Sequence, residues 1–334
     1  MINVCCFFLV YLAISINAYA DKVQSGEAVA FYIENDSRII GGPGSDQAYS
    51  NGFKFSYIYA ENRIPVWSNH PASLFQKIDP KIESEKINYG LSLAQQIFTP
   101  MDTNKKNQIL DDRPYAAWLY VGLAMSFKEN DVGHFFEVDL GTVGPSALGQ
   151  EAQNNFHDTI HVKQAEGWHN GLHDEPTLQL FYQKRFRTIM NKHFDFFPYY
   201  GAALGNVLLG THIGGLIRVG IGLPNDFGPS RPSSSDGDSF IIPNAGSAVS
   251  NKSYYVFAGA RGNIIARSIF LDGNSFQEGP HVSRLPMTYE TEFGFGSQIH
   301  DIGLVWSFVT RSPQFSQKNK FSSFASINII YTFN

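Results

Sequence analysis

The chain is 334 residues long, and only 16% of its residues are charged, compared with about 25% in ordinary soluble domains. Aromatic residues reach 14% and glycine occurs 30 times, a mixture that favours β-structure over helical bundles. The net charge of −5 excludes a general nucleic-acid binder, because no basic excess is present to neutralise phosphates.

The N-terminus has the pattern of a secretory signal peptide. Residues 4–16 are nearly all apolar and precede the small-x-small cleavage motif Ala18-Tyr19-Ala20, although no basic residue comes before the run. The run is too short to span a bilayer comfortably, which disfavours an uncleaved anchor. We therefore expect residues 1–20 to be removed, which leaves residues 21–334 as one barrel domain without cysteine.

After the signal peptide, hydrophobicity alternates with a period of two along nearly the whole chain. In residues 87–98, for example, the odd positions are mainly large and apolar, while the even positions are small or polar. This alternation predicts about twelve strands. They are expected near residues 27–35, 51–59, 87–98, 115–127, 134–141, 177–187, 194–205, 212–222, 253–263, 289–299, 302–310 and 326–334.

The two faces of these strands differ in a way that indicates a membrane protein. In residues 51–59, aromatic side chains alternate with glycine, lysine and serine. A soluble sandwich or barrel would instead combine a charged or polar outer face with a tight apolar core. We therefore predict an all-β fold, a transmembrane antiparallel β-barrel with lipid outside and a polar lumen.

Three segments break the alternation. Residues 61–84 and 224–251 are polar, contain proline and glycine, and are expected to be long loops. Residues 149–173 are rich in histidine and amide side chains, and a short helix is expected over about 146–161, within an insertion near 146–165, with Ser146 as its cap. This insertion is either a solvated loop or a catalytic element.

Two clusters have the chemistry of a site. His157 and His161 would share one helix face, as in half of a zinc site, but the His-Glu-x-x-His pattern is absent. Glu34-Asn35-Asp36 closes the first strand and residues 46–51 open the second, which brings together oxygen ligands of the kind that Ca²⁺ prefers. The same residues are also common in turns without a metal.

The order and spacing of several motifs resemble the outer-membrane lipid A 3′-O-deacylase family. The motifs are Phe31-x-x-Glu34-Asn35-Asp36, Tyr49-Ser50-Asn51-Gly52, Gln96-Ile97-Phe98-Thr99-Pro100, Asn104-Lys105, Asp112-Arg113-Pro114-Tyr115-Ala116-Ala117-Trp118-Leu119, Gly144-Pro145, Gln150-Glu151-x-Gln153-Asn154-x-x-His157 and Gly167-Trp168. The resemblance covers essentially the whole mature chain. It implies a twelve-stranded barrel in the bacterial outer membrane that hydrolyses the 3′-linked acyloxyacyl ester of lipid A and requires Ca²⁺.

The resemblance also implies site residues. The family's functional positions are matched by Asn35, Asp36, Ser50, Lys105, Gln153 and His157. The position of Ser50 is commonly Thr in the family, and Lys163 stands where characterised members have a glutamate. Glu151, Asp158 and Glu166 are the nearby carboxylates that could replace that glutamate, and Glu166 is assigned as the metal ligand beside Asn35 and Asp36.

These residues suggest a hydrolytic mechanism with alternatives. An imidazole with a pKa of about 6.5 can activate water at neutral pH, so His157 is the expected general base. In a second version, Ser50 is the nucleophile and His157 its base. Lys105 is expected to bind a lipid A phosphate or assist the oxyanion.

Two other functions stay open at this point. The barrel is alternatively an outer-membrane phospholipase, or a porin or degenerate barrel without catalysis, which the lysine at position 163 keeps possible. We expect a monomer surrounded by outer-membrane lipids, with lipopolysaccharide as the partner.

Overall fold

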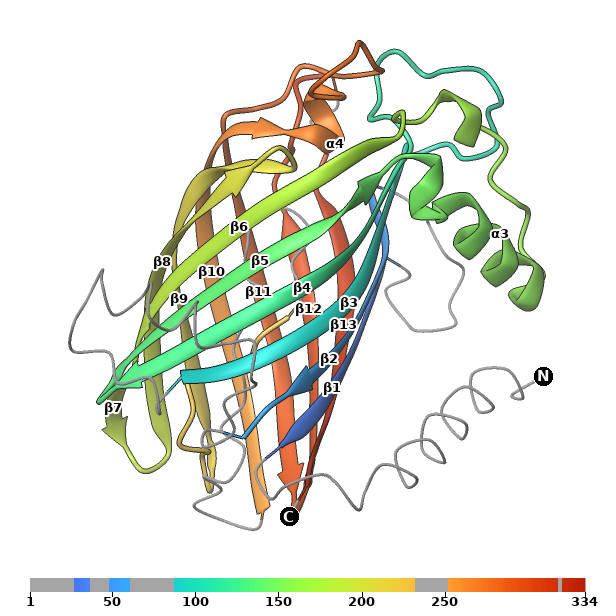
Figure 1. Cartoon of the computed structure of the whole chain (residues 1–334). Coiled ribbons are helices and arrows are strands. Elements are labelled where there is room, and N and C mark those ends of the chain that lie inside the picture. Colours follow the sequence, from blue (N-terminus) through green and yellow to red (C-terminus); the bar gives the residue numbers. More distant parts are fainter. Residues whose placement is uncertain (1–26, 37–47, 61–86, 232–251, 318–319, 334) are drawn as a thin grey trace.

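The computed structural model describes residues 27–36, 48–60, 87–231, 252–317 and 320–333. The expected signal peptide and most of the expected loops 61–84 and 224–251 lie outside these residues. The described strands form one antiparallel sheet in which strands adjacent in sequence pair with each other, except β6 and β7, and β1 pairs with β13 (Figure 1). Pairing between β6 and β8 closes this sheet into a barrel.

The strands lie where the alternation predicts them. They are β1 (Ala28–Asn35), β2 (Ala48–Ile58), β3 (Ile87–Thr99), β4 (Ala116–Glu129), β5 (Val132–Val143), β6 (Glu175–Phe186), β7 (Thr188–Asn191), β8 (Phe194–Gly205), β9 (Leu208–Ile221), β10 (Lys252–Ser268), β11 (Met287–Ile299), β12 (Ile302–Arg311) and β13 (Ser322–Thr332). Because β7 continues β6 beyond Arg187 and pairs with the same strand β8, the barrel wall has twelve strands. The predicted fold class is therefore confirmed.

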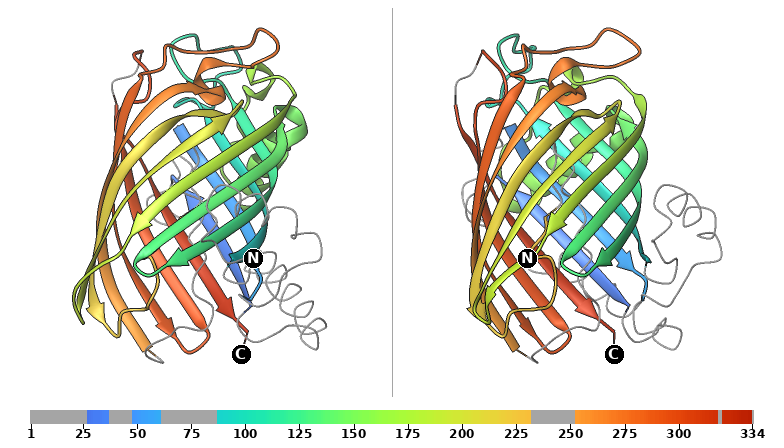
Figure 2. Two further views of the ribbon diagram at one scale, coloured as in Figure 1. Left: turned by 60° about the vertical axis from the view of Figure 1, so that its left-hand side comes forward. Right: turned by 90° about the vertical axis from the view of Figure 1, so that its left-hand side faces the viewer.

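The two ends of the barrel differ in what they carry. At the end that we call the terminal end, β1 begins and β13 finishes, with Ala28 opposite Thr332. The opposite, insertion end carries the helices (Figures 1 and 2). These are the 3₁₀ turns Pro145–Ala147 and Trp168–Asn170 and the helices α3 (Gly149–Ile160) and α4 (Ile269–Asp272). None of the helices in the described ranges has the length and apolar character needed to cross a membrane.

The expected helix is present, but the expected cap is wrong. The helix α3 starts at Gly149, and its cap residue is Leu148, which has a left-handed φ of 57° and no capping side chain. Ser146 instead belongs to the preceding 3₁₀ turn, which starts at Pro145, and its backbone N–H donates to Asp174 Oδ1 at 2.7 Å. Proline initiates this turn because its φ already suits a helical start.

The outward face of the wall is apolar and the inward face is polar, as predicted. Burial alternates along most of the strands, so that in β3 Leu91 and Leu93 are exposed while Ser92 and Ala94 are buried. Exposed outward side chains include Val121, Leu140, Leu178, Ile213, Ile217, Val256, Phe293 and Phe295. A wall of this kind suits hydrocarbon outside, since its backbone groups are paired between strands.

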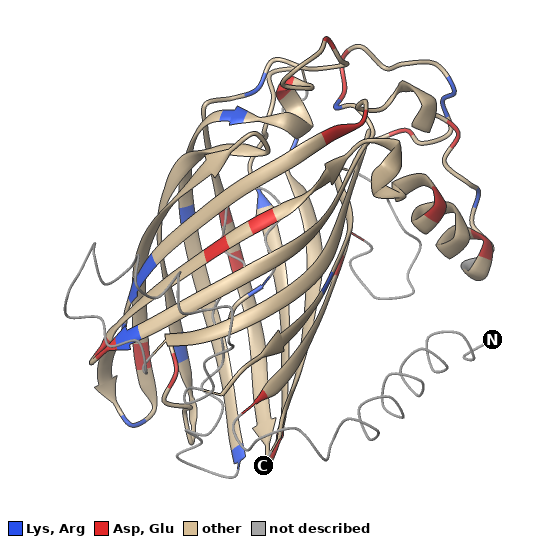
Figure 3. Ribbon diagram, in the orientation of Figure 1, with Lys and Arg blue, Asp and Glu red and all other residues tan. Residues whose placement is uncertain are grey.

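Basic and acidic residues both occur along the strands (Figure 3), and several of their buried side chains form ion pairs. Lys54 Nζ lies 3.0 Å from Glu137 Oε1, and both side chains are fully buried. Arg218 on β9 forms a 2.7 Å ion pair with Asp195 on β8. Buried charges are tolerated when each has a partner of opposite sign, because removal of one partner would leave an uncompensated charge in the interior.

The chain after β9 enters the lumen. We call residues 223–231 the lumen segment. Near the terminal end, its Phe227 packs edge-on against Phe135, with ring centroids 5.9 Å apart. At its other end, Arg231 pairs with Glu290 and, at 3.2 Å, with Glu292 on β11. Because Glu290 lies near the insertion end of β11, the lumen segment occupies much of the length of the barrel interior.

Candidate active site

The first group of predicted residues lies where β1 and β2 meet at the insertion end. Asn35 is opposite Asn51 in the ladder, and a bulge between Tyr49 and Asn51 leaves Ser50 out of register. The Ser50 carbonyl accepts the Asn35 Nδ2 amide at 3.1 Å and the Asp36 backbone N–H at 3.3 Å. The strand pairing thus brings together Asn35, Asp36 and Ser50, which the sequence had separated by a loop.

Ser50 is also tied to the third strand. Its hydroxyl forms a short hydrogen bond with Thr99 Oγ1, and both residues are almost completely buried. Bulges commonly redirect a side chain at the rim of a barrel. Sequence reasoning assigned no role to Thr99, although it lies inside a quoted motif just before Pro100.

The second group lies on the insertion, which rests against the outside of the wall. A Cβ on Gly149 would lie 2.4 Å from Ala117 Cβ of β4, so only glycine allows the helix to approach this closely. Ala152 and Trp168 pack against a cluster that contains Ile97 of β3 and Ala117 of β4. The start of α3 is therefore fixed against the outward faces of β3 and β4 (Figure 1).

His157 owes its orientation to the way α3 ends. His161 takes a left-handed φ of 59°, and the chain turns back along the helix. The returning backbone places the Lys163 carbonyl 2.8 Å from His157 Nδ1. A carbonyl only accepts, so Nδ1 carries the proton in the neutral ring and Nε2 carries the basic lone pair. His157 is only 3% exposed.

The hydrogen bond from His157 Nδ1 shows whether the lysine at position 163 affects the orientation of the imidazole. The acceptor is the backbone carbonyl of Lys163, so it does not depend on the side chain at that position. The lysine ammonium points to another partner, the Glu166 carboxylate, at 3.0 Å. The departure from the family pattern therefore leaves the orientation of His157 intact.

Gln153 lies one helical turn before His157. Its Oε1 accepts a 2.8 Å hydrogen bond from the indole N–H of Trp168. Its Nε2 is buried and has no hydrogen-bond partner among the residues that the structure describes. Trp168 belongs to the motif Gly167-Trp168, but its contact with Gln153 follows from the turn after α3 and was not expected.

The remaining predicted residues, Glu166 and Lys105, lie at the border of the insertion. Glu166 forms ion pairs with Lys163 and, at 3.6 Å, with Lys106. The hydrogen bond from Lys163 holds the pKa of the Glu166 carboxyl below its ordinary value, and Lys106 acts in the same direction. Lys105 is largely exposed, with its ammonium 3.9 Å from Asp102.

The loop that carries Lys105 is fastened to the insertion by main-chain contacts. Asn170 donates to the Lys106 carbonyl at 2.6 Å, and the Glu166 N–H donates to the Thr103 carbonyl at 3.0 Å. A Cβ on Gly167 would lie 2.7 Å from the Lys105 carbonyl, so a glycine is needed there. The lysine loop is therefore held against the part of the insertion that follows α3.

Both groups of residues border the same short part of β3. Thr99 contacts Ser50, while Ile97, two residues earlier on the same face, packs with the cluster that holds Trp168. Ile97 is also the ladder partner of Asn51. Tertiary pairing thus brings the strand-end oxygens and the helix with Gln153 and His157 to neighbouring positions on the outer wall.

The oxygen chemistry at the strand ends fits a hard cation. Asp36 is a buried carboxylate, and the Ser50 carbonyl and Asn35 amide supply neutral oxygens beside it. Ca²⁺ accepts such mixed oxygen ligands. Across the described ranges, no three or more His, Cys, Asp or Glu side chains gather into a metal cluster. A cation here would therefore rest on one strand-end carboxylate and several uncharged oxygens.

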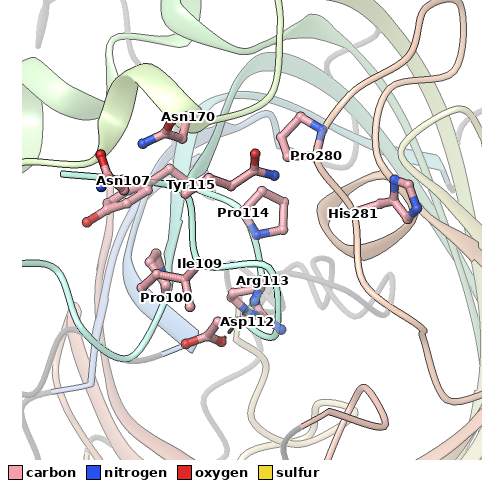
Figure 4. Close-up of a pocket in the computed structure, with 11 residues that line it drawn as sticks. Pro100, Asn107, Ile109, Asp112, Arg113, Pro114, Tyr115, Asn170, Pro280 and His281 are labelled. Atoms are coloured by element: carbon pink, nitrogen blue, oxygen red, sulfur yellow. Dashed lines mark hydrogen bonds between the residues drawn. The ribbon is translucent and has the colours of Figure 1, made fainter. Parts of the chain in front are cut away.

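A small pocket lies beside the site under the loop after β3 (Figure 4). Its volume of about 10 Å³ has room for about one water molecule, so it does not accommodate a lipid. Arg113 lines it and holds the rim together, donating to the Ala48 carbonyl at 3.1 Å and to Gln314 at 2.6 Å. Burial lowers the pKa of Arg113 to about 10, which leaves it charged at neutral pH.

Fold and site together define an outer-membrane-type β-barrel with a polar site on the outside of its wall, beneath a helical insertion. A family model described as outer membrane protein LpxR matches residues 4–333, and the chain belongs to this family. The resemblance inferred from the motifs is thereby confirmed, and the chain is an outer-membrane protein. A search of curated protein sequences finds no match.

The fold agrees with that of a solved structure of the same family. The chain is similar to LpxR from Salmonella typhimurium, with a TM-score of 0.71 at 19% identity over 92% of this chain and 100% of that one. The β-domain of the Bordetella autotransporter BrkA is less similar, with a TM-score of 0.44 at 10% identity over 92% of this chain and 99% of that one.

Proposed function

We propose that this protein is a Ca²⁺-dependent lipid A 3′-O-deacylase that acts in the outer leaflet of the outer membrane. Family membership supports a lipid A deacylase in general. The observation that carries the finer proposal is the buried His157, whose Nδ1 is bonded to a backbone carbonyl on the membrane-facing side of the wall. That hydrogen bond gives Nδ1 the proton and makes Nε2 the basic nitrogen of the ring.

His157 acts as the general base. Its Nε2 takes a proton from a water molecule while the water oxygen attacks the acyl carbon of the ester. When the ester C–O bond breaks, the same proton passes to the departing sugar oxygen, so a free fatty acid and a sugar hydroxyl result. The Lys163 carbonyl keeps the ring in the required tautomer and stabilises the protonated imidazole.

The strand ends hold the cation in this proposal. Asp36, with Asn35 and the Ser50 oxygens beside it, would bind Ca²⁺, and the bound ion would supply positive charge for the developing oxyanion. Glu166 would join them only by leaving its two lysine partners. A site with few carboxylates is expected to bind Ca²⁺ weakly, on the order of 10⁻⁴–10⁻³ M.

The placement of the site suits a lipid substrate. Asn35 lies on the outward face of β1 with Ile33, so acyl chains in the membrane reach it without entering the barrel. Lys105 is exposed on the loop fastened to the insertion and is the proposed contact for a lipid A phosphate. A phosphate on a solvated lysine orients the headgroup while the ester lies lower, against the wall.

Water is preferred over Ser50 as the nucleophile. The Ser50 hydroxyl bonds to Thr99, and its carbonyl supports Asn35 and Asp36, so the residue is engaged with the strand ends. Replacing Ser50 by alanine should therefore lower activity only partly. Complete loss, with a trapped acyl-enzyme in the wild-type protein, would instead assign the nucleophile to Ser50.

The lumen argues against the porin alternative. The lumen segment occupies the interior between Phe135 and Glu290, and its Arg185 contacts hold it there through the carbonyls of Phe227 and Pro229. Planar-bilayer recordings of the wild-type protein should show no steady open conductance. A stable open channel would support the porin alternative.

The decisive experiment gives purified protein in detergent either lipid A or phospholipid, with Ca²⁺ or with a chelator, and weighs the products by mass spectrometry. We expect loss of the 3′-linked acyl group from lipid A with Ca²⁺ only. Release of fatty acid from phospholipid alone would make the protein a phospholipase. No release from either lipid under any condition would leave a barrel without catalysis.

A further inference from the structure

We propose that Trp168 is a positioning residue that holds the Gln153 side chain so that its amide N–H groups donate to the carbonyl oxygen of the scissile ester. The inference deepens the proposed deacylase function and rests on it. It assigns a second source of oxyanion stabilisation, a neutral amide on the helix, besides a cation at the strand ends.

The first observation is an incomplete hydrogen-bond set. Gln153 is 6% exposed, and its Nε2 has no hydrogen-bond partner within the described part of the chain. A buried amide N–H₂ without an acceptor is unfavourable, and natural interiors rarely leave one unpaired. An unpaired donor at a candidate active site therefore indicates an acceptor that arrives with the substrate.

The second observation is that the direction of this donor is determined. The indole nitrogen of Trp168 can only donate, and it lies 2.8 Å from Gln153 Oε1. Turning the amide over would place two N–H groups against each other. Trp168 therefore fixes which end of the amide faces the indole, and Nε2 is left on the other side.

The third observation is the rigidity of Trp168 itself. Its ring lies 5.0 Å from that of Tyr115, and it packs against the cluster containing Ile97 on the wall. A Cβ on Gly149 would come within 2.6 Å of the indole, so the ring fills the space beside the helix. The indole N–H is thus held by packing rather than by a flexible loop.

The geometry of the helix places the donor and the base together. Gln153 and His157 are four residues apart on α3, on the same face as Gly149, which touches the wall. The carbonyl oxygen of the ester gains negative charge as water attacks. The hydrogen bond from a fixed N–H donor is therefore stronger in the transition state than in the complex with the neutral ester. Gln153 therefore lowers the barrier, and Trp168 acts only through Gln153.

The test compares Trp168→Phe, which keeps an aromatic ring and removes the N–H donor, with Gln153→Ala in a double-mutant cycle. Trp168→Phe should lower kcat about 10- to 100-fold with little change in KM, because a donor that is not held in place stabilises the transition state poorly. Gln153→Ala should lower kcat by about 10²-fold. Adding Trp168→Phe to Gln153→Ala should cause no further loss.

The matched control is Trp306→Phe on β12, where the indole contacts lipid-facing Phe293 and Phe295 and should not affect kcat. Folding of each variant is checked by the heat-dependent gel shift of the barrel. Additive losses in the double variant, or an unchanged kcat for Trp168→Phe in an otherwise active enzyme, would overturn the positioning role alone. A wild-type protein that deacylates nothing would overturn the proposed function and this inference together.

Discussion

The barrel lumen and the site on the outer wall both bury polar side chains, but they use them differently. In the lumen, the Glu290 carboxylate forms ion pairs with three arginines, Arg231, Arg261 and Arg311. On the outer wall, His157 Nδ1 donates to the Lys163 carbonyl, and Gln153 Oε1 accepts from the Trp168 indole. The lumen groups named here pair with one another, whereas His157 and Gln153 are the residues proposed to act on a ligand.

The strongest test of this contrast replaces His157 by alanine. Loss of the general base should lower kcat by about 10²–10⁴-fold, because no positioned base then takes the proton from the attacking water. The midpoint of urea unfolding in detergent should fall only slightly, since the hydrogen bond lost to the Lys163 carbonyl contributes about 1 kcal/mol. Unchanged acyl release, measured by mass spectrometry, would remove His157 from the mechanism.

A lumen variant should show the opposite behaviour. Glu290→Gln leaves three buried arginines without their shared counter-charge, which is expected to cost about 3 kcal/mol of unfolding free energy. The unfolding midpoint followed by gel shift should fall, while kcat of the folded fraction stays at the wild-type level. A selective loss of kcat with normal stability would show that lumen and outer wall are coupled.

Removal of the strand-end charge should have an intermediate effect. Asp36→Asn keeps the size of the side chain and removes the carboxylate proposed to hold Ca²⁺, so activity at limiting Ca²⁺ should fall about 10- to 100-fold. Raising the Ca²⁺ concentration should restore part of it. Activity of the wild-type protein that persists with excess chelator would contradict the calcium requirement.

The smallest effect is expected for Glu166→Gln. If the carboxylate stays with Lys163 and Lys106, the apparent Ca²⁺ affinity should change less than about fivefold, because exposed ion pairs contribute little. The lowered pKa of Glu166 means that the ion pairs form at neutral pH and are lost as pH falls through that lowered value. A large fall in Ca²⁺ affinity would make Glu166 a metal ligand.

Much of the barrel was predictable because strand side chains alternate strictly. In β3, the alternation of large and small residues from Ile87 onward predicted which side chains face lipid, and the observed burial agrees with that prediction. The polar composition of the insertion likewise indicated a helix with His157 on it. The cap at Ser146 was predicted wrongly, because a 3₁₀ turn beginning at Pro145 precedes the helix.

Details of the site were less accessible because they depend on long-range pairing. The bulge at Ser50 arises from the pairing of β2 with β3, and Thr99 is 49 residues away from it in the chain. The acceptor for His157 is the main-chain carbonyl of Lys163, and a main-chain contact cannot be predicted from the residue type at that position. Trp168 and Gln153 were both visible as motif residues, but the hydrogen bond between them was not predicted.

By itself, the sequence determined the strands, their lipid and lumen faces and the family, because these depend on local periodicity and on motifs read in order. The tertiary structure alone decided how the strand ends, the helix and the returning chain after His161 meet on the outside of the wall. The physical reason is that hydrogen bonds and ion pairs between distant segments, such as Arg231 with Glu290, exist only after the barrel has closed.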